Sequence, residues 1–400
     1  MKGNKRFLKP LFIGFIALLI GGVWFTFGRG ENSPAEQVTD SNQSTTVTKK
    51  YEPNLNTETI VSGHSNIWDL VFPDTETAFY SLRAGEIWGY SLKTDEKWKV
   101  ASVGQVLAQG EGGLLGLALD TNFADNRYGY MCYNSTGTPK SVRVARFRTA
   151  EDRKSISDIV EIVRDIESQA GRHSGCRLAM DKNEHLWVAT GDSALGTSPQ
   201  NPKSLAGKVL RIDRDGRGVN GNLGDQFDTR IFSYGHRNIQ GLVLFDEPIN
   251  GSYGFTAEHG PDRDDEINQI KSGNYGWDPV KGARGYNESV PMTDKTKFPD
   301  AIDALWSSGR STIAVSGIER LSAEHWSAWR DRLAIAVLKD KQIRLMEFDD
   351  NHKLISEQTL FQNEFGRIRA VREGPDGNLY FTTDNGNDDK IIRVSPKATF

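Results

Sequence analysis

The chain has 400 residues, of which 37% are hydrophobic, and it carries a formal net charge of -4 with a pI near 6.0. This balance provides no general basic face, which argues against nucleic acid as a partner. Glycine is abundant at 40 residues, aromatic residues make up 10%, and long amphipathic helical patterns are scarce, so the composition indicates an all-β protein. Cys132 and Cys176 leave two options open, one disulfide or two separate thiols.

The chain begins with a basic stretch that includes Lys2, Lys5 and Arg6, followed by an uncharged apolar run over residues 11–27. This pattern is typical of an export segment. The run is longer than the roughly 7–15 apolar residues of a cleaved signal and lies at the short end of the roughly 17–25 that span a bilayer. We expect residues 1–28 to form a hydrophobic helix that acts as an uncleaved anchor, a cleaved signal being the alternative. The body is then periplasmic or extracytoplasmic, and it meets the membrane only through this segment.

Residues 29–56 are rich in polar side chains and predict a flexible linker. From residue 57 to residue 400, short β-rich runs and turns alternate, which predicts antiparallel sheets arranged as propeller blades or as a sandwich. Units of roughly 40–60 residues favour a propeller, although periodicity alone does not give the number of blades. The predicted strands are Ile67–Phe72, Ala78–Leu82, Ile87–Ser91, Leu114–Leu119, Tyr128–Tyr133, Val142–Arg148, Arg177–Met180, Leu186–Thr190, Lys208–Ile212, Ile231–Tyr234, Leu242–Phe245, Ile313–Ile318, Leu333–Leu338, Ile343–Phe348, Ile368–Arg372, Leu379–Thr383 and Ile391–Val394.

One hairpin, over residues 172–192 (RHSGCRLAMDKNEHLWVATGD), carries two ionisable side chains at its open end. The start of the first strand of a hairpin lies beside the end of the second, so we expect His173 and Asp192 to meet at one rim. Histidine titrates near neutral pH, which suits it to act as a base that a carboxylate orients. A surface hairpin with an ordinary loop histidine is the alternative.

Two other polar stretches can bind a ligand. In GHRNIQG, Arg237, Asn238 and Gln240 supply a guanidinium and two amides between glycines, a set suited to the carbonyls or carboxylates of a flat molecule, a polar turn being the alternative. In GRIRAVR, Arg367 and Arg369 alternate along a predicted strand, so both guanidinium groups lie on one face and can bind an anionic ligand.

The stretch over residues 258–268 is acidic. Asp265 and Glu266 follow Gly260 and Pro261, and both carboxylates and backbone carbonyls are ligands that calcium prefers. The spacing does not match an EF-hand loop, and a solvated acidic loop is the alternative.

Taken together, these motifs resemble those of the soluble aldose-sugar and glucose dehydrogenases that use pyrroloquinoline quinone (PQQ). Between Trp68 and Val394 the family's motifs occur in order: GEGGLLGLALD, HSGCRL with ATGD, GKVLRIDRDG, GHRNIQG, EHGPDRDDEIN with NYGW, VLKDKQIRL and GRIRAVREGPDGNLY. The resemblance implies a six-bladed β-propeller over residues 57–400 with PQQ across its mouth. It also implies oxidation of aldoses at the anomeric carbon by hydride transfer to PQQ, with calcium as a cofactor-binding Lewis acid.

The resemblance also implies roles for individual residues. His173 resembles the general base, Asp192 the residue that orients it, and Arg237 the residue that polarises the quinone carbonyl. Positions that resemble the family's cofactor contacts are Glu111, Arg237, Asn238, Gln240, His259, Thr312, Lys339, Arg367 and Arg369. Positions that resemble calcium ligands are Gly260 and Pro261 beside the cofactor, and Asp265 and Glu266 at a second, structural calcium.

Some residues depart from the family pattern. Arg172 puts a positive charge next to the histidine, Cys176 stands where a small residue is expected, and His259 replaces a glutamine of the glucose-type enzymes, which favours the aldose-sugar branch. The sugar and the external electron acceptor do not follow from the sequence. A non-catalytic binding propeller and a calcium-dependent lactonase are the competing functions.

Overall fold

The computed structural model describes residues 52–169, 171–282 and 285–397. The expected anchor over residues 1–28 and the linker up to residue 51 lie outside the described residues. Within the described ranges, no helix is long and apolar enough to cross a membrane.

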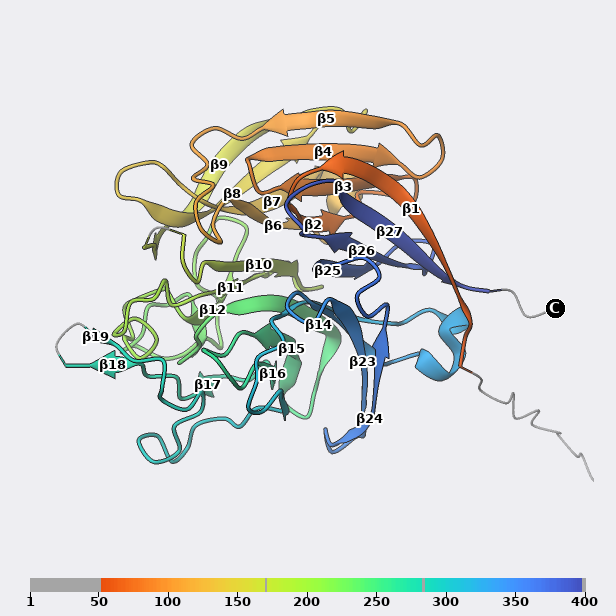
Figure 1. Cartoon of the computed structure of the whole chain (residues 1–400). Helices are drawn as coiled ribbons and strands as arrows, with labels where there is room; N and C mark the ends of the chain where they lie inside the picture. Colours follow the sequence, from red (N-terminus) through yellow and green to blue (C-terminus); the bar gives the residue numbers. More distant parts are fainter. Residues whose placement is uncertain (1–51, 170, 283–284, 398–400) are drawn as a thin grey trace, which may run out of the picture. The chain divides into compact units, whose positions relative to one another are not determined.

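The described strands form six main sheets and one two-stranded ribbon (Figure 1). The first three sheets contain β2 (Ile67–Val71), β3 (Thr77–Leu82), β4 (Glu86–Ser91) and β5 (Lys97–Ser102); β6 (Leu114–Leu119), β7 (Tyr128–Asn134), β8 (Ser141–Thr149) and β9 (Ile156–Glu167); and β10 (Gly175–Met180), β11 (Leu186–Thr190), β12 (Lys208–Ile212), β13 (Ile231–Tyr234) and β17 (Gly273–Asn274). The other three contain β14 (Ile239–Ile249), β15 (Ser252–Glu258), β16 (Glu266–Gln269) and β20 (Trp306–Ser307); β21 (Val315–Arg320), β22 (Leu333–Val337), β23 (Gln342–Phe348) and β24 (Leu354–Leu360); and β25 (Ile368–Glu373), β26 (Leu379–Thr383), β27 (Asp389–Pro396) and β1 (Leu55–His64). The ribbon is β18 (Val280–Lys281) with β19 (Gly285–Tyr286), and the helices of the described part of the chain are α1 (Phe123–Asn126) and η1 (Glu324–Trp329), both short.

The innermost strands of the six sheets form a closed ring. Each of β2, β6, β10, β14, β21 and β25 contacts the next, and β25 contacts β2. The last sheet joins both ends of the described chain, because β1 pairs antiparallel with β27, with Leu55 opposite Pro396 and Thr59 opposite Ile392 (Figure 1). The fold is therefore a six-bladed β-propeller, and the sandwich alternative is wrong.

Burial explains part of the sequence prediction, although the mostly buried β15 and β16 were not predicted. All residues of β11 (LWVAT) and β22 (LAIAV) are buried, so these strands appear as apolar runs. The outermost strands β5, β9 and β24 contain few buried residues, so their apolar pattern is weak and the sequence does not predict them. The first described strand, β1, was also missed and begins two residues before the expected start of the propeller.

Apolar clusters fill the spaces between neighbouring blades. Trp187 of the third blade, for example, packs against Phe232 and against Tyr253 of the fourth, with ring centroids 4.8 and 5.1 Å apart. A disulfide between Cys132 in β7 and Cys176 in β10 joins the second and third blades. This settles the choice that the sequence left open, in favour of one bridge.

Candidate active site

His173 and Asp192 meet at the open end of the β10–β11 hairpin, as the sequence predicts. The Nδ1 atom of His173 lies 2.9 Å from Oδ1 of Asp192, and both side chains are buried. The approach depends on Gly191, because a Cβ atom there would lie 1.9 Å from the carbonyl oxygen of His173. Asp192 occupies Nδ1, and no described residue hydrogen-bonds to the other ring nitrogen, Nε2.

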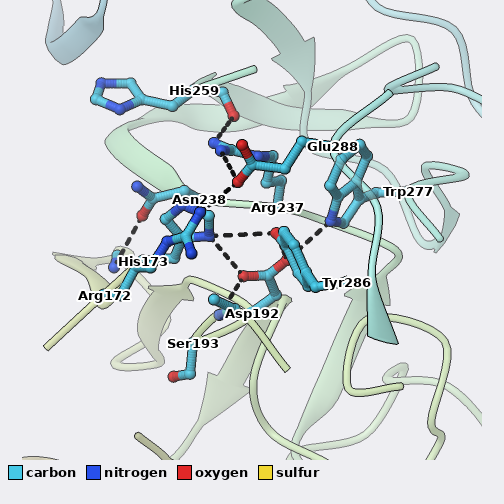
Figure 2. Close-up of polar contacts among 12 residues, drawn as sticks. Arg172, His173, Asp192, Ser193, Arg237, Asn238, His259, Trp277, Tyr286 and Glu288 are labelled. Atoms are coloured by element: carbon cyan, nitrogen blue, oxygen red, sulfur yellow. Dashed lines mark hydrogen bonds and ion pairs between the residues drawn. The ribbon is translucent and has the colours of Figure 1, made fainter. Parts of the chain in front are cut away.

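Three further donors hold Asp192 in place (Figure 2). The hydroxyl of Tyr286 donates to Oδ2 at 2.6 Å, the indole nitrogen of Trp277 donates to Oδ2 at 2.8 Å, and the amide of Ala194 donates to Oδ1 at 2.8 Å. Burial, and then the charge of Asp192, raise the pKa of Tyr286, so this hydroxyl keeps its proton and donates. The carboxylate is thus fully engaged in orienting the histidine.

Arg237 lies beside this pair and is held by an acceptor at each end of its guanidinium group. Its Nη1 atom donates to the carbonyl of His259 at 3.1 Å, and its Nη2 atom lies 3.3 Å from Oε1 of Glu288. The same oxygen of Glu288 accepts a hydrogen bond from Arg172, which lies outside the buried pair (Figure 2). The departure at position 172 is therefore part of an ion bridge at the rim.

A chain of polar contacts connects Glu111 to the sixth blade. Oε2 of Glu111 accepts hydrogen bonds from the backbone amide of His173 at 3.2 Å and from Nδ2 of Asn238 at 3.1 Å. Gln240 donates to Oδ1 of Asn238 at 2.9 Å and accepts from Arg369 at 3.0 Å. These four side chains, which come from three separate stretches of the sequence, therefore form one connected group.

Arg369 also pairs with a carboxylate. Its Nε atom lies 2.9 Å from Oδ2 of Asp384, and Asn66 donates to the other oxygen of Asp384 at 2.7 Å. Burial alone would raise the pKa of Asp384, but Arg369 and Asn66 outweigh it and hold the pKa below its ordinary value. The ion pair is thus charged and fixes the guanidinium group.

Two neighbouring cavities share Glu111, His259 and Ala314 in their walls. The first, of about 180 Å³, is lined by Glu111, His173, Arg237, Asn238, His259, Gly260, Pro261, Asp265, Thr312 and Ala314. The second, of about 110 Å³, is lined by Trp68, Glu111, Leu115, Ser174, Gly175, Gln240, His259, Ala314, Leu338, Arg367 and Arg369. The cavities therefore bring together most of the residues that the sequence predicts.

Three cationic or ionisable side chains at or near these walls differ in their surroundings. Lys339 donates to the carbonyl of Thr312 at 2.7 Å, so it lies next to the first cavity. Burial, and then the neighbouring Arg369, lower the pKa of Arg367. Enclosure by protein atoms, followed by the charges of Arg369 and Arg237, lower the pKa of His259 to about 3, so its imidazole is neutral near pH 7.

Asp265 and Glu266, predicted as calcium ligands, have different surroundings. Both oxygens of Asp265 accept backbone amides, from Gly260 at 2.9 Å and from Ile313 at 2.7 Å, so this carboxylate shapes the loop. Glu266 is buried, and burial together with the nearby Glu258 raises its pKa well above the ordinary value. No group of three or more His, Cys, Asp or Glu side chains suited to a metal ion occurs among the described residues. Their roles as ligands remain predictions.

Buried charges that the sequence reasoning missed lie beneath the second cavity. Arg177 is buried, pairs with Asp69 at 2.5 Å and lies 4.1 Å from the ring centroid of Trp68, which lines that cavity. Asp69 also lies 3.3 Å from Arg372 of the sixth blade. The sequence did contain a signal for this ion pair, because an arginine and an aspartate stand within short strands that are otherwise apolar. Charged side chains in such strands are buried only when they are paired.

Comparisons with known proteins identify relatives of the whole propeller. A family model described as glucose/sorbosone dehydrogenase matches residues 64–393. The aldose sugar dehydrogenase YliI of Escherichia coli K12 is 29% identical over 360 residues, which cover 86% of this chain and 93% of that protein. An uncharacterized protein of Synechocystis is 33% identical over 303 residues, covering 72% of this chain and 71% of its own. The PQQ-bound aldose sugar dehydrogenase of Streptomyces coelicolor matches with a TM-score of 0.70 at 26% identity, covering 86% of this chain and 100% of that one.

Proposed function

Because the chain belongs to the glucose/sorbosone dehydrogenase family and is a PQQ-dependent sugar dehydrogenase, we propose that it oxidises aldoses at the anomeric carbon with His173 as general base. The observation that carries this proposal is the buried pair of His173 and Asp192, 2.9 Å apart, whose histidine lines a cavity together with Arg237. Membership of this family favours the dehydrogenase over the two competing functions, the binding propeller and the lactonase.

The residues around the cavities fit PQQ, a flat quinone with several carboxylates. Arg367 and Arg369 in the second cavity and Lys339 next to the first supply cations suited to charge-assisted contacts with carboxylates. The buried nitrogens Nε of Arg237 and Nε2 of His259 have no hydrogen-bond partner among the described residues. Buried polar atoms normally have partners, so these two support a polar ligand in the cavity.

Each side chain of the site then has a separate role in the reaction. Oδ1 of Asp192 accepts a hydrogen bond from Nδ1–H of His173, which leaves the lone pair of Nε2 to take the proton of the anomeric hydroxyl. Asp192 stabilises the charged imidazole that results. Arg237, fixed by the carbonyl of His259, places positive charge where negative charge develops. When bound, PQQ supplies the hydride acceptor.

Calcium fits the same region in two ways. Gly260 and Pro261 line the first cavity, where their backbone carbonyls would hold an ion beside the cofactor. Away from it, the buried Glu266 and Glu258 bring two carboxylates together, and Oδ1 of the neighbouring Asn268 has no partner among the described residues. A cation there would relieve the cost of burying like charges. It would act as a structural ion.

Reconstitution tests the proposed function. The purified propeller should bind PQQ in the presence of calcium and reduce a dye with one or more aldoses, whereas His173→Gln should bind PQQ but lose about 10²–10⁴-fold in kcat. His185→Gln is the matched control, because His185 also pairs with an aspartate, Asp181, at 3.2 Å, but at the turn of the hairpin. Full turnover by His173→Gln, or no turnover of the wild type with any aldose, would contradict the proposal.

We also propose that the propeller is exported and tethered by residues 1–28, on the basis of their basic and apolar sequence. Cells that express the full chain should retain the enzyme in the membrane fraction on the periplasmic or outer side, and removal of residues 1–28 should leave it inside the cell. Equal distribution of both forms would refute the tether.

A further inference from the structure

Glu288 lies where the buried site meets solvent. It follows Tyr286 by two residues, and the Tyr286 hydroxyl contacts Asp192 at 2.6 Å and Nδ1 of His173 at 3.3 Å. The side chain of Glu288 is 40% exposed, whereas that of its partner Arg237 is only 5% exposed. This carboxylate is thus at the rim, close to the base and accessible to a molecule that enters from solution.

Two arginines fix one oxygen of Glu288 and leave the other free. Oε1 accepts hydrogen bonds from Arg172 and, at 3.3 Å, from Arg237, while no described residue donates to Oε2. Arg172 is itself placed by the ring of Tyr286, whose centroid lies 5.7 Å from its guanidinium carbon (Figure 2). A carboxylate that is oriented before the ligand arrives costs less entropy on binding than a mobile one.

A fixed carboxylate oxygen at this position suits a sugar hydroxyl. The cations that fit the carboxylates of the cofactor, Arg367 and Arg369, lie in the second cavity. Glu288 lies elsewhere, in contact with Arg172 and Arg237. Hydrogen bonds between hydroxyl groups and an ionised acceptor are short and strong. We propose that Oε2 of Glu288 accepts a hydrogen bond from an aldose hydroxyl near the reacting carbon and thereby selects the sugar. This inference rests on the proposed function.

Deoxy sugars test this role directly. Steady-state kinetics of the PQQ-loaded enzyme should be compared for an active aldose and its 2-, 3-, 4- and 6-deoxy forms, in wild type, Glu288→Gln and Glu288→Ala. We expect the wild type to lose about 10- to 100-fold in kcat/KM for one deoxy sugar, and Glu288→Ala to lose that discrimination mainly through a higher KM. Glu288→Gln, whose amide oxygen can still accept from Arg237, should keep kcat within about threefold. Glu247→Gln is the matched control, since Glu247 forms an exposed ion pair with Lys182.

The outcomes separate this role from its alternatives. Affinity for PQQ, measured by titration of the apoenzyme, should be unchanged in Glu288→Ala. A weaker PQQ affinity, or a lower kcat at constant KM, would mean that Glu288 only orients Arg237 and would overturn the proposal. An unchanged deoxy-sugar profile in Glu288→Ala would overturn it too. Inactivity of the wild type with every aldose would instead refute the proposed function on which the inference rests.

Discussion

Replacement of Asp192 by asparagine is the sharpest perturbation of the proposed base. Each oxygen of Asp192 accepts a hydrogen bond from an N–H group that can only donate. These are the backbone amide of Ala194 at Oδ1 and the indole nitrogen of Trp277 at Oδ2. An amide has only one oxygen, so in either orientation its NH₂ group meets an N–H donor. If the NH₂ group faces His173, the imidazole adopts the other tautomer and loses its free lone pair. If it faces Tyr286, the negative charge that stabilises the protonated base is still lost.

We therefore expect Asp192→Asn to lower kcat by about 10²–10⁴-fold, which corresponds to about 3–5 kcal/mol of transition-state stabilisation. Stopped-flow reduction of the bound cofactor, with PQQ affinity measured in parallel, provides the assay. Asp181→Asn is the matched control, because Asp181 has similar partners at the far end of the same hairpin. Its Oδ2 atom lies 3.2 Å from Nδ1 of His185 and accepts a hydrogen bond from the indole nitrogen of Trp187 at 2.9 Å. An Asp192→Asn variant within about threefold of the wild-type kcat, or an equal loss in Asp181→Asn, would refute the reasoning.

Three further predictions concern stability, each measured as the free energy of unfolding in urea or as Tm. Wild-type stability should fall as the pH drops below 6.5, because unfolded His259 takes up a proton whereas the folded side chain, with a pKa of about 3, does not. This difference costs about 2 kcal/mol by pH 5, and the stability of His259→Gln should depend less steeply on pH. Burial and Glu258 raise the pKa of Glu266, so without calcium its stabilising contribution is present in acid and is lost as the pH rises through that pKa. Calcium should raise Tm at neutral pH, and Glu266→Gln should remove most of that rise; an equal rise in both would exclude the structural ion. Alanine at Cys132 and Cys176, which close a loop with a sequence separation of 44, should cost roughly 2–4 kcal/mol, and an equal stability of the reduced wild type and the oxidised wild type would argue against the bridge.

The local part of the fold and site was predictable because it depends on neighbours in sequence. Alternating and apolar runs gave most inner strands, and the hairpin over residues 172–192 placed His173 beside Asp192 since antiparallel pairing fixes which ends meet. The number of blades came only from the family resemblance. Ring closure joins β1 to β27 across nearly the whole chain, and no local pattern encodes that contact.

The contacts between blades were not predictable from the sequence in the same way. Trp277 and Tyr286 reach Asp192 from 85 and 94 residues further along the chain, and their pattern does not distinguish a site residue from a core aromatic. Glu288 belongs to none of the motifs that the sequence analysis singled out, and its proposed role depends on Arg172, which stood out only as a departure from the family. The partners of side chains that meet through tertiary packing can be identified only when the arrangement of the blades in the closed ring is known.

The most direct test of His173 as the base is a single-turnover experiment with an aldose that carries deuterium at its anomeric carbon. The wild-type protein, loaded with PQQ and calcium, should reduce the bound cofactor more slowly with the deuterated sugar than with the ordinary one. His173→Gln should hold PQQ with unchanged affinity and reduce it at least about 100-fold more slowly. Reduction at the wild-type rate by His173→Gln, with the same isotope effect, would show that another group removes the proton and would contradict the account.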